Sequence, residues 1–164
     1  MTQPLHLGLV GAMPEEIGSD LSHLKDLNCS DHGDLRIHRG SWGGDVRLSL
    51  AWSGWGKVSA ARAATRLLAS DPSIDLLLFT GVAGAADPAL SQWDVVLADA
   101  VVQHDMDARP LFPRFTLPAL NQDRLQPQPP WFDWAKTALI EAHNAGDLQG
   151  FARPSSGLIA TGDR

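Results

Sequence analysis

Two glutamates that follow a short apolar run are the residues best placed for acid–base chemistry. Residues 5–12 are mostly apolar and too few for a helix, so they predict a buried strand. Pro14, Glu15 and Glu16 come next and predict the first turn of a helix, where proline and carboxylates are both favoured. A carboxylate at the end of a strand can hold and deprotonate a water molecule. Acids in a first helical turn also stabilise the helix without any catalytic duty, so both interpretations stay open at this point.

A glycine-containing turn after a second apolar run is the other candidate. Residues 74–82 are nearly all apolar and predict a central strand covered on both faces, and the turn 80–84 follows at its carboxyl end. Open α/β sheets bind ligands at the carboxyl ends of their strands. Trp55, between two glycines in another strand-to-helix turn, is the one tryptophan for which we expect more than core packing. Glu16 and the turn 80–84 therefore predict a ligand site at one edge of a sheet.

Other chemistries find less support. Gly54, Gly56 and Lys57 partly match a phosphate-binding loop, but the required Ser or Thr is missing after the lysine. No dinucleotide fingerprint is complete in residues 8–11, which lack its third glycine. Residues 104–107 offer metal donors, yet nothing elsewhere supplies further ligands at a recognisable spacing, so loop packing is the better interpretation. We expect no metal and no cofactor.

The remaining pattern predicts an α/β sheet layered by helices. Helices are expected at residues 14–25, 57–70 and 131–144, a hairpin over 36–51, and strands at 94–102 and 157–160. We expect the strand 94–102 to lie beside 74–82 in one sheet. Repeated prolines between residues 104 and 130 predict a long ordered loop, a kind of segment that is often functional.

Composition places the chain among folded globular proteins. Its 164 residues, 44% of them apolar, suit one domain over residues 1–164. A formal net charge of -6 repels the phosphate backbone of nucleic acids. Cys29 is the single cysteine, and the sequence holds neither an apolar run that would cross a bilayer nor the pattern of a signal peptide. We therefore expect a cytoplasmic protein that binds neither nucleic acid nor membranes.

Five motifs in this order resemble the 5′-methylthioadenosine/S-adenosylhomocysteine nucleosidases of the purine nucleoside phosphorylase superfamily. They are the segments 8–16, 53–58, 80–84, 104–105 and 161–163. Each motif alone is weak, but five in the family order with family-like spacing make the resemblance specific, and it covers the whole chain. It implies a three-layer α/β/α fold with a central mixed sheet, of the phosphorylase/hydrolase type.

The resemblance also implies an activity. Such an enzyme hydrolyses the bond between adenine and ribose in 5′-methylthioadenosine and S-adenosylhomocysteine, a step of methionine salvage and nucleoside catabolism. Glu16 matches the family's catalytic glutamate, which activates the attacking water. Met13 matches the methionine beside the ribose, and Ala83 and Gly84 match the turn along the purine and ribose.

The chain also departs from the family pattern. Trp55 stands where the family usually has a smaller aliphatic residue near the sugar, and Val82 where nucleosidases commonly have a serine near the water. Without that hydroxyl the phosphorylase alternative, which needs phosphate binding, is weaker. The family's adenine-protonating aspartate and ribose-binding glutamate fall beyond Arg164. We therefore expect a fold truncated at its C-terminus, a fragment or truncated gene product with little or no activity alone.

A partner and three alternatives follow from the same resemblance. Family members are homodimers in which the loop after the His-Asp pair closes the neighbour's site, so residues 106–115 are expected to form a dimer contact. The alternatives are a purine nucleoside phosphorylase, a hydrolase for another nucleoside, and a non-catalytic nucleoside-binding relic. The preferred 5′-substituent of the nucleoside stays open.

Overall fold

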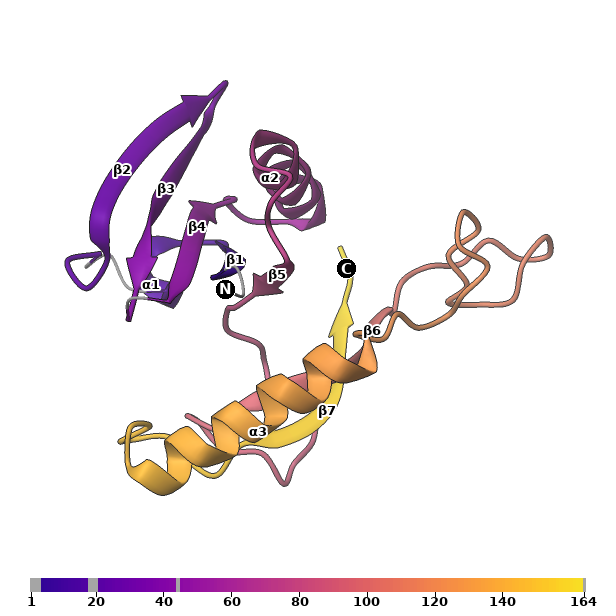
Figure 1. Ribbon diagram of the computed structural model, residues 1–164. Coiled ribbons are helices and arrows are strands. Elements are labelled where there is room, and N and C mark those ends of the chain that lie inside the picture. Colours follow the sequence, from indigo (N-terminus) through magenta and orange to yellow (C-terminus); the bar gives the residue numbers. More distant parts are fainter. Residues whose placement is uncertain (1–3, 18–20, 44, 164) are drawn as a thin grey trace. The chain divides into compact units, whose positions relative to one another are not determined.

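The computed structural model describes residues 4–17, 21–43 and 45–163. The chain divides into two compact units, Met1–Gly84 and Ala85–Arg164. Both units combine strands with helices, and the first unit contains a sheet with both parallel and antiparallel pairs (Figure 1). The α/β class with a central mixed sheet that the sequence predicts is confirmed, whereas the single domain over residues 1–164 stays a prediction.

Five strands form the sheet of the first unit. They are β1 (Leu5–Gly11), β2 (Lys25–His32), β3 (Leu35–Trp42), β4 (Val46–Trp52) and β5 (Leu76–Phe79), in the order β2-β3-β4-β1-β5. Strands β2, β3 and β4 pair antiparallel, while β1 runs parallel to both β4 and β5. The carboxyl ends of β4, β1 and β5 therefore meet at one edge of the sheet.

Each face of this sheet is covered by apolar side chains. Helix α2 (Lys57–Ser70) buries Ala63 and Leu67 against a cluster formed by Val10, Leu35, Ile37 and Ala51. A second cluster of Leu24, Leu48 and Leu50, with Leu7, Leu9, Leu21 and Trp52 packed against it, uses the alternate residues of the same strands. Each buried aliphatic side chain of this size contributes roughly 1.5–3 kcal/mol to stability, and together these clusters hold the strand ends in place.

A buried histidine closes the opposite, amino end of β1. The His6 residue is 2% exposed, and its ring contacts Ser73 (Nδ1 to Oγ, 3.0 Å) and Ser49 (Nε2 to Oγ, 2.9 Å). The Ser73 hydroxyl donates its proton to Asp71, so His6 Nδ1 donates to Ser73, and Nε2 accepts from Ser49. The backbone of His6 is paired on both sides with Asp75, its N–H donating to the carboxylate and its carbonyl accepting the Asp75 N–H. The connection between α2 and β5 is thereby fixed to β1.

The second unit is a two-stranded sheet with a helix. Strands β6 (Val96–Gln103) and β7 (Ser155–Thr161) pair parallel, and α3 (Pro129–Ala145) packs on β6. The helix begins with two prolines and ends at Gly146, whose positive φ of 82° favours glycine. The loop predicted between residues 104 and 130 holds only isolated bridges before α3 begins, among the described residues, and this prediction is confirmed, as is the helix over 131–144.

The helix predicted over residues 14–25 is wrong beyond its first turn. Helix α1 covers only Pro14–Ile17, and Lys25 already begins β2. Strand β2 is polar and mostly exposed on both faces. Its sequence therefore lacks the alternation of apolar and polar residues by which a strand is predicted. Leu21 and Leu24, which have helical spacing, lie in a turn and pack against the second apolar cluster. Residues 18–20 of that prediction lie outside the described residues, as do Gly44 and Arg164.

The position predicted for one apolar strand is also corrected. Strand β5 lies at the end of the strand order of the first unit, not at the central place expected for residues 74–82, and β1 lies between β4 and β5. The Phe79 side chain, at the last residue of β5, is 64% exposed. Strand β6 pairs with β7 within the second unit, and the expected place of residues 94–102 beside 74–82 stays a prediction. Apolar runs report that a strand is covered on its faces, but they carry no information on which strand lies beside it.

Candidate functional site

Three chain segments are joined at the carboxyl edge of the first sheet. The N–H groups of Ser53 and Gly54, just after β4, donate to the carbonyls of Gly11 (2.9 Å), the last residue of β1, and of Ala12 (3.0 Å), the residue after it. The N–H of Thr80, just after β5, donates to the carbonyl of Val10 (3.0 Å). These bonds continue the parallel ladders past the strand ends and fix the loops that carry the predicted site residues.

Glu16 lies at the centre of this edge. Its Oε2 accepts hydrogen bonds from the backbone N–H groups of Ala12 (2.6 Å) and Met13 (3.1 Å). Since Pro14 is the first residue of α1, Met13 is the N-cap and Glu16 is the third helical residue. In a capping box the side chain of the third helical residue accepts a hydrogen bond from the backbone N–H of the N-cap, and Glu16 makes this bond with Met13. The short helix α1 therefore directs the Glu16 side chain back toward the end of β1.

The other carboxylate oxygen of Glu16 faces β5. A Cβ built on Gly81 would lie 3.2 Å from Oε1, so the glutamate occupies the space that a side chain at position 81 needs. Within the residues that the structure describes, Oε1 has no hydrogen-bond partner, because both bonds of the group involve Oε2. One oxygen is thus held by the protein while the other is left for a further donor.

Trp55 sits in a turn that only glycines could shape. Gly54 and Gly56 on either side have φ values of 77° and 91°, in the left-handed region that side chains disfavour. The Trp55 side chain is 76% exposed. The buried Ser53 closes the turn by donating to the Gly54 carbonyl (2.7 Å), and Arg62 of α2 donates to the Ser53 carbonyl (3.3 Å). This network holds the turn against α2 and leaves the indole at the surface.

Three further predicted residues follow β5. Val82, Ala83 and Gly84 come directly after Gly81 and are exposed, Val82 at 84%. No hydrogen bond in the described part of the chain joins them to Glu16 or Met13. The structure therefore brings Glu16, Met13 and the Trp55 turn to one sheet edge, and it places Val82, Ala83 and Gly84 on the chain that leaves the same edge.

Two contributors to this edge carried no clear signal in the sequence. The N–H of Ala12 makes the shorter bond to Glu16, and Gly81 provides the space in which that side chain lies. A backbone donor leaves no trace in residue type. Gly81 belongs to the turn 80–84 that the sequence predicts, but its role depends on the parallel pairing of β1 with β5.

The two remaining motifs meet in the second unit, at the carboxyl ends of β6 and β7. The N–H of His104 donates to the Thr161 carbonyl (2.9 Å), and the N–H of Asp163 donates to the Asp105 carboxylate (2.6 Å). The His104 ring lies over Gly162, where any side chain would collide with it. The described residues contain no group of three or more His, Cys, Asp or Glu side chains with a geometry that suits a metal ion. None of the described helices is long and apolar enough to cross a bilayer.

Known proteins share both the sequence and the fold. A nucleosidase for 5′-methylthioadenosine and S-adenosylhomocysteine from Chromohalobacter salexigens is 32% identical over 158 residues, which cover 96% of this chain and 63% of that protein. The crystal structure of the Colwellia psychrerythraea 34H nucleosidase in complex with adenine superimposes with a TM-score of 0.83 at 30% identity, covering 99% of this chain and 64% of that one. Futalosine hydrolase of Helicobacter pylori gives a TM-score of 0.78 at 26% identity, with 98% and 65% covered.

The chain spans less than two thirds of the length of each of these three proteins. Over that span the agreement is continuous, since a family model described as the phosphorylase superfamily matches residues 6–164. The matched range includes both sheets and every motif segment described above, from β1 to the residues after β7. The chain therefore belongs to the phosphorylase superfamily.

Proposed function

We propose that this protein is a nucleosidase that hydrolyses the bond between adenine and ribose in 5′-methylthioadenosine and S-adenosylhomocysteine. The observation that carries the proposal is the Glu16 carboxylate, held through Oε2 by two backbone N–H groups and presenting Oε1 at the carboxyl edge of the sheet. Relatives with this named activity match the chain over 96% of its length, and a neighbour of the same kind binds adenine.

The chemistry assigned to Glu16 is that of a general base. Oε1 accepts a proton from a water molecule that attacks the anomeric carbon of the ribose, while positive charge develops on the sugar. The bond to adenine breaks with its electron pair going to the purine, which takes up a proton from solvent and leaves as neutral adenine. The backbone bonds to Oε2 keep the carboxylate from rotating, so the base is oriented before substrate arrives. Met13 and Trp55 then border the sugar, and Val82, Ala83 and Gly84 run along the nucleoside. No metal or cofactor takes part.

A pair of adjacent glutamates provides a matched test. Glu16→Gln keeps the shape and removes the base, and should lower adenine release from 5′-methylthioadenosine by about 10²–10⁴-fold. Glu15→Gln changes the exposed neighbouring carboxylate and should keep the wild-type rate. Adenine is measured by chromatography for the 164-residue chain, with the Chromohalobacter salexigens relative as reference.

The same assay separates the alternatives. Release that is independent of phosphate supports hydrolysis, and release that requires phosphate would instead show a phosphorylase. Equal rates for the two glutamine variants would refute the role of Glu16. No release at all would refute hydrolysis by this chain, and calorimetry with adenine would then decide whether it is a nucleoside-binding protein without turnover.

A hydrolase for another nucleoside is the second candidate, and the similarity to futalosine hydrolase favours it. Futalosine and 5′-methylthioadenosine are therefore compared as substrates at equal concentration. Faster cleavage of futalosine would replace the first proposal, while the position of Glu16 serves either reaction.

We further propose a cytoplasmic homodimer formed through residues 106–115. The Met106 carbonyl accepts the N–H of Phe115 (2.9 Å), which closes this segment into a loop. Leu111 at its tip is 84% exposed, an apolar side chain of the kind found in contacts between subunits. Sedimentation should show a dimer for the wild type and a monomer for Leu111→Asp, and a monomeric wild type would refute the contact.

A further inference from the structure

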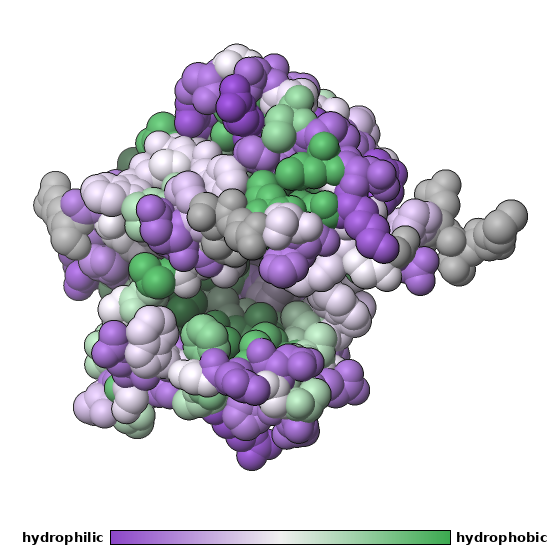
Figure 2. Space-filling view, turned by 90° about the vertical axis from the view of Figure 1, so that its left-hand side faces the viewer, coloured by the Kyte–Doolittle hydropathy of each residue, from purple (hydrophilic) through white to green (hydrophobic). Residues whose placement is uncertain are grey.

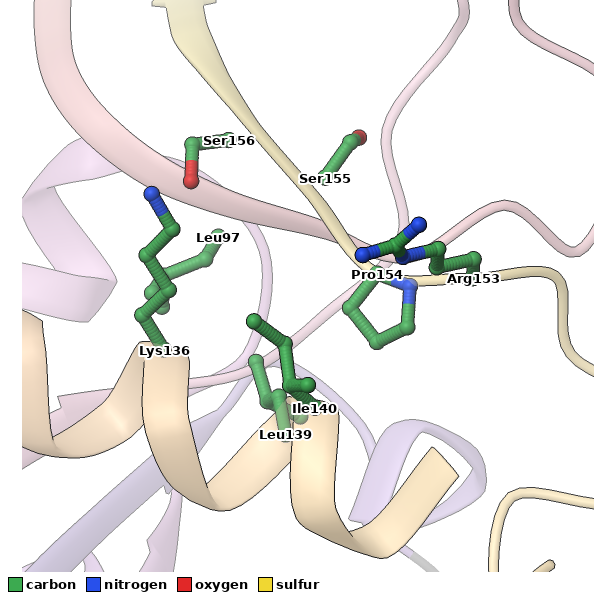
Figure 3. A pocket seen from close by; sticks show the side chains of 8 residues that line it. All are labelled: Leu97, Lys136, Leu139, Ile140, Arg153, Pro154, Ser155 and Ser156. Carbon is green, nitrogen blue, oxygen red and sulfur yellow. The ribbon is translucent and has the colours of Figure 1, made fainter. Parts of the chain in front are cut away.

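A pocket of about 290 Å³ lies in the second unit, at the end of the sheet opposite to His104 and Asp163. It is bordered by α3 and by the first residues of β6 and β7 (Figure 3). Leu97, Leu139 and Ile140 supply apolar walls, and Lys136, Arg153 and Ser156 supply polar groups. The volume is near the lower end of the range for small-molecule sites, so its ligand must be small.

The charge of this pocket is opposite to that of its surroundings. Residues 85–164 contain ten Asp or Glu against six Lys or Arg, yet two of those six basic residues line the pocket and no acidic residue does. In the described part of the chain neither Lys136 nor Arg153 pairs with a carboxylate, in contrast to Arg109, which forms an ion pair with Asp107 (2.5 Å). Two cations without counter-charges favour an anionic ligand.

The polar groups are spread across the apolar walls. Figure 3 shows Lys136 on one side, reaching toward Ser156, and Arg153 on the other side, with Ile140 and Pro154 between them. The Ser155 hydroxyl donates to the Val95 carbonyl (3.4 Å), whereas the Ser156 hydroxyl forms no hydrogen bond with the described residues and is left as a donor. A ligand with an anionic group at each end and a short hydrocarbon body between matches this distribution.

We propose that this pocket binds a short aliphatic dicarboxylate. One carboxylate accepts from the Lys136 ammonium and the Ser156 hydroxyl, and the other accepts from the Arg153 guanidinium, whose planar fork suits a carboxylate. The methylene groups contact Leu97, Leu139 and Ile140. This site is independent of the proposed hydrolysis, because every residue that forms it belongs to the second unit and Glu16 to the first.

Calorimetry with adipate as the probe tests the proposal on the 164-residue chain. We expect a Kd of about 1 mM for a ligand of this size. Arg153→Gln and Lys136→Gln should each weaken binding about fivefold or more, since each removes one charge-assisted contact. Arg124→Gln, at an exposed arginine outside the pocket, is the matched control and should leave the Kd unchanged.

Three further ligands make the result decisive. Hexanoate, which has one carboxylate, should bind more weakly than adipate, and the neutral 1,6-hexanediol and inorganic phosphate should bind more weakly still. Equal binding of adipate and the diol, or of adipate to the wild type and both glutamine variants, would overturn the proposal. Absence of adipate binding at ten times the expected Kd would also overturn it. Circular dichroism of each variant verifies that the fold is retained.

Discussion

The buried His6 makes a defined contribution to the pH dependence of stability. Burial lowers the pKa of this imidazole, Arg47 acts in the same direction, and the nearby Asp71 and Asp75 oppose both effects without cancelling them. The Asp71 carboxylate is 3.9 Å from Nδ1, and Arg47 itself contacts Asp71 (3.4 Å). The native state therefore prefers the neutral ring, with Nδ1 donating to Ser73 and Nε2 accepting from Ser49.

The sign and size of the effect follow from linkage. The unfolded chain has a histidine pKa near 6.5, and the folded pKa lies below it, so the contribution of His6 is fully present above about pH 6.5. As pH falls from there toward the folded pKa, the unfolded state binds a proton that the native state does not, and stability is lost. One proton sets a maximum slope of about 1.4 kcal/mol per pH unit.

Urea unfolding between about pH 5 and pH 8, followed by tryptophan fluorescence, measures this slope, since the chain has six tryptophans. His6→Gln has no titrating group, so its free energy of unfolding should decline less steeply than that of the wild type below pH 6.5. The pKa of His38, which burial also lowers, adds a slope of the same sign that both proteins keep. His23→Gln changes an exposed ring and should retain the wild-type slope. Identical slopes for the wild type and His6→Gln would refute the reasoning.

Three other perturbations test separate parts of the structure. Gly81→Ala should displace the Glu16 carboxylate by a few tenths of an ångström and lower adenine release about tenfold or more. Gly157→Ala is the control, because its added Cβ makes only an ordinary van der Waals contact, and unchanged release in Gly81→Ala would contradict the geometry. Ile37→Ala, at a side chain with no exposure, should cost about 2–5 kcal/mol in urea unfolding, whereas Leu120→Ala at an exposed site should cost less than about 0.5 kcal/mol. The Arg109 guanidinium lowers the pKa of Asp107 to about 2, so Arg109→Gln should return that carboxyl toward its usual value in an NMR titration, and an unmoved pKa would show that the pair does not form in solution.

The local sequence pattern predicted strands and helices correctly where one face of the element is buried. The prediction failed where neither face is buried. The apolar alternation of β3 and β4 and the punctuation of α3 by Pro129 and Gly146 are local signals, and both were predictable. Strand β2 lacks them because it is polar on both faces, and the helical spacing of Leu21 and Leu24 came from packing in a turn. Pairing partners are non-local, which is why the central position predicted for residues 74–82 was wrong.

The candidate site was predictable as a set of residues but not as a geometry. Order along the chain placed Glu16 and the turn 80–84 at strand ends, and parallel pairing then put those ends at one edge. The hydrogen bond from the Ala12 N–H to the Glu16 carboxylate and the space left by Gly81 both depend on backbone positions to within fractions of an ångström. Lys136 and Arg153 line one pocket although they are 17 positions apart in sequence. No spacing rule predicts that a residue on a helix and a residue in a loop lie together, so the sequence did not indicate this pocket.

The position of β1 between β4 and β5 has a consequence for the order in which the chain assembles during synthesis. Strand β1 leaves the ribosome first, yet its partners are β4 and β5, and its first ladder pairs Leu5 with Val46. The antiparallel strands β2, β3 and β4 are joined by short connections and can form a meander with little loss of chain entropy. Nascent β1 therefore waits, apolar and with both edges unpaired, until that meander and then β5 emerge. In this interval the segment 5–11 is the part of the nascent chain most exposed to chaperones and to misassociation.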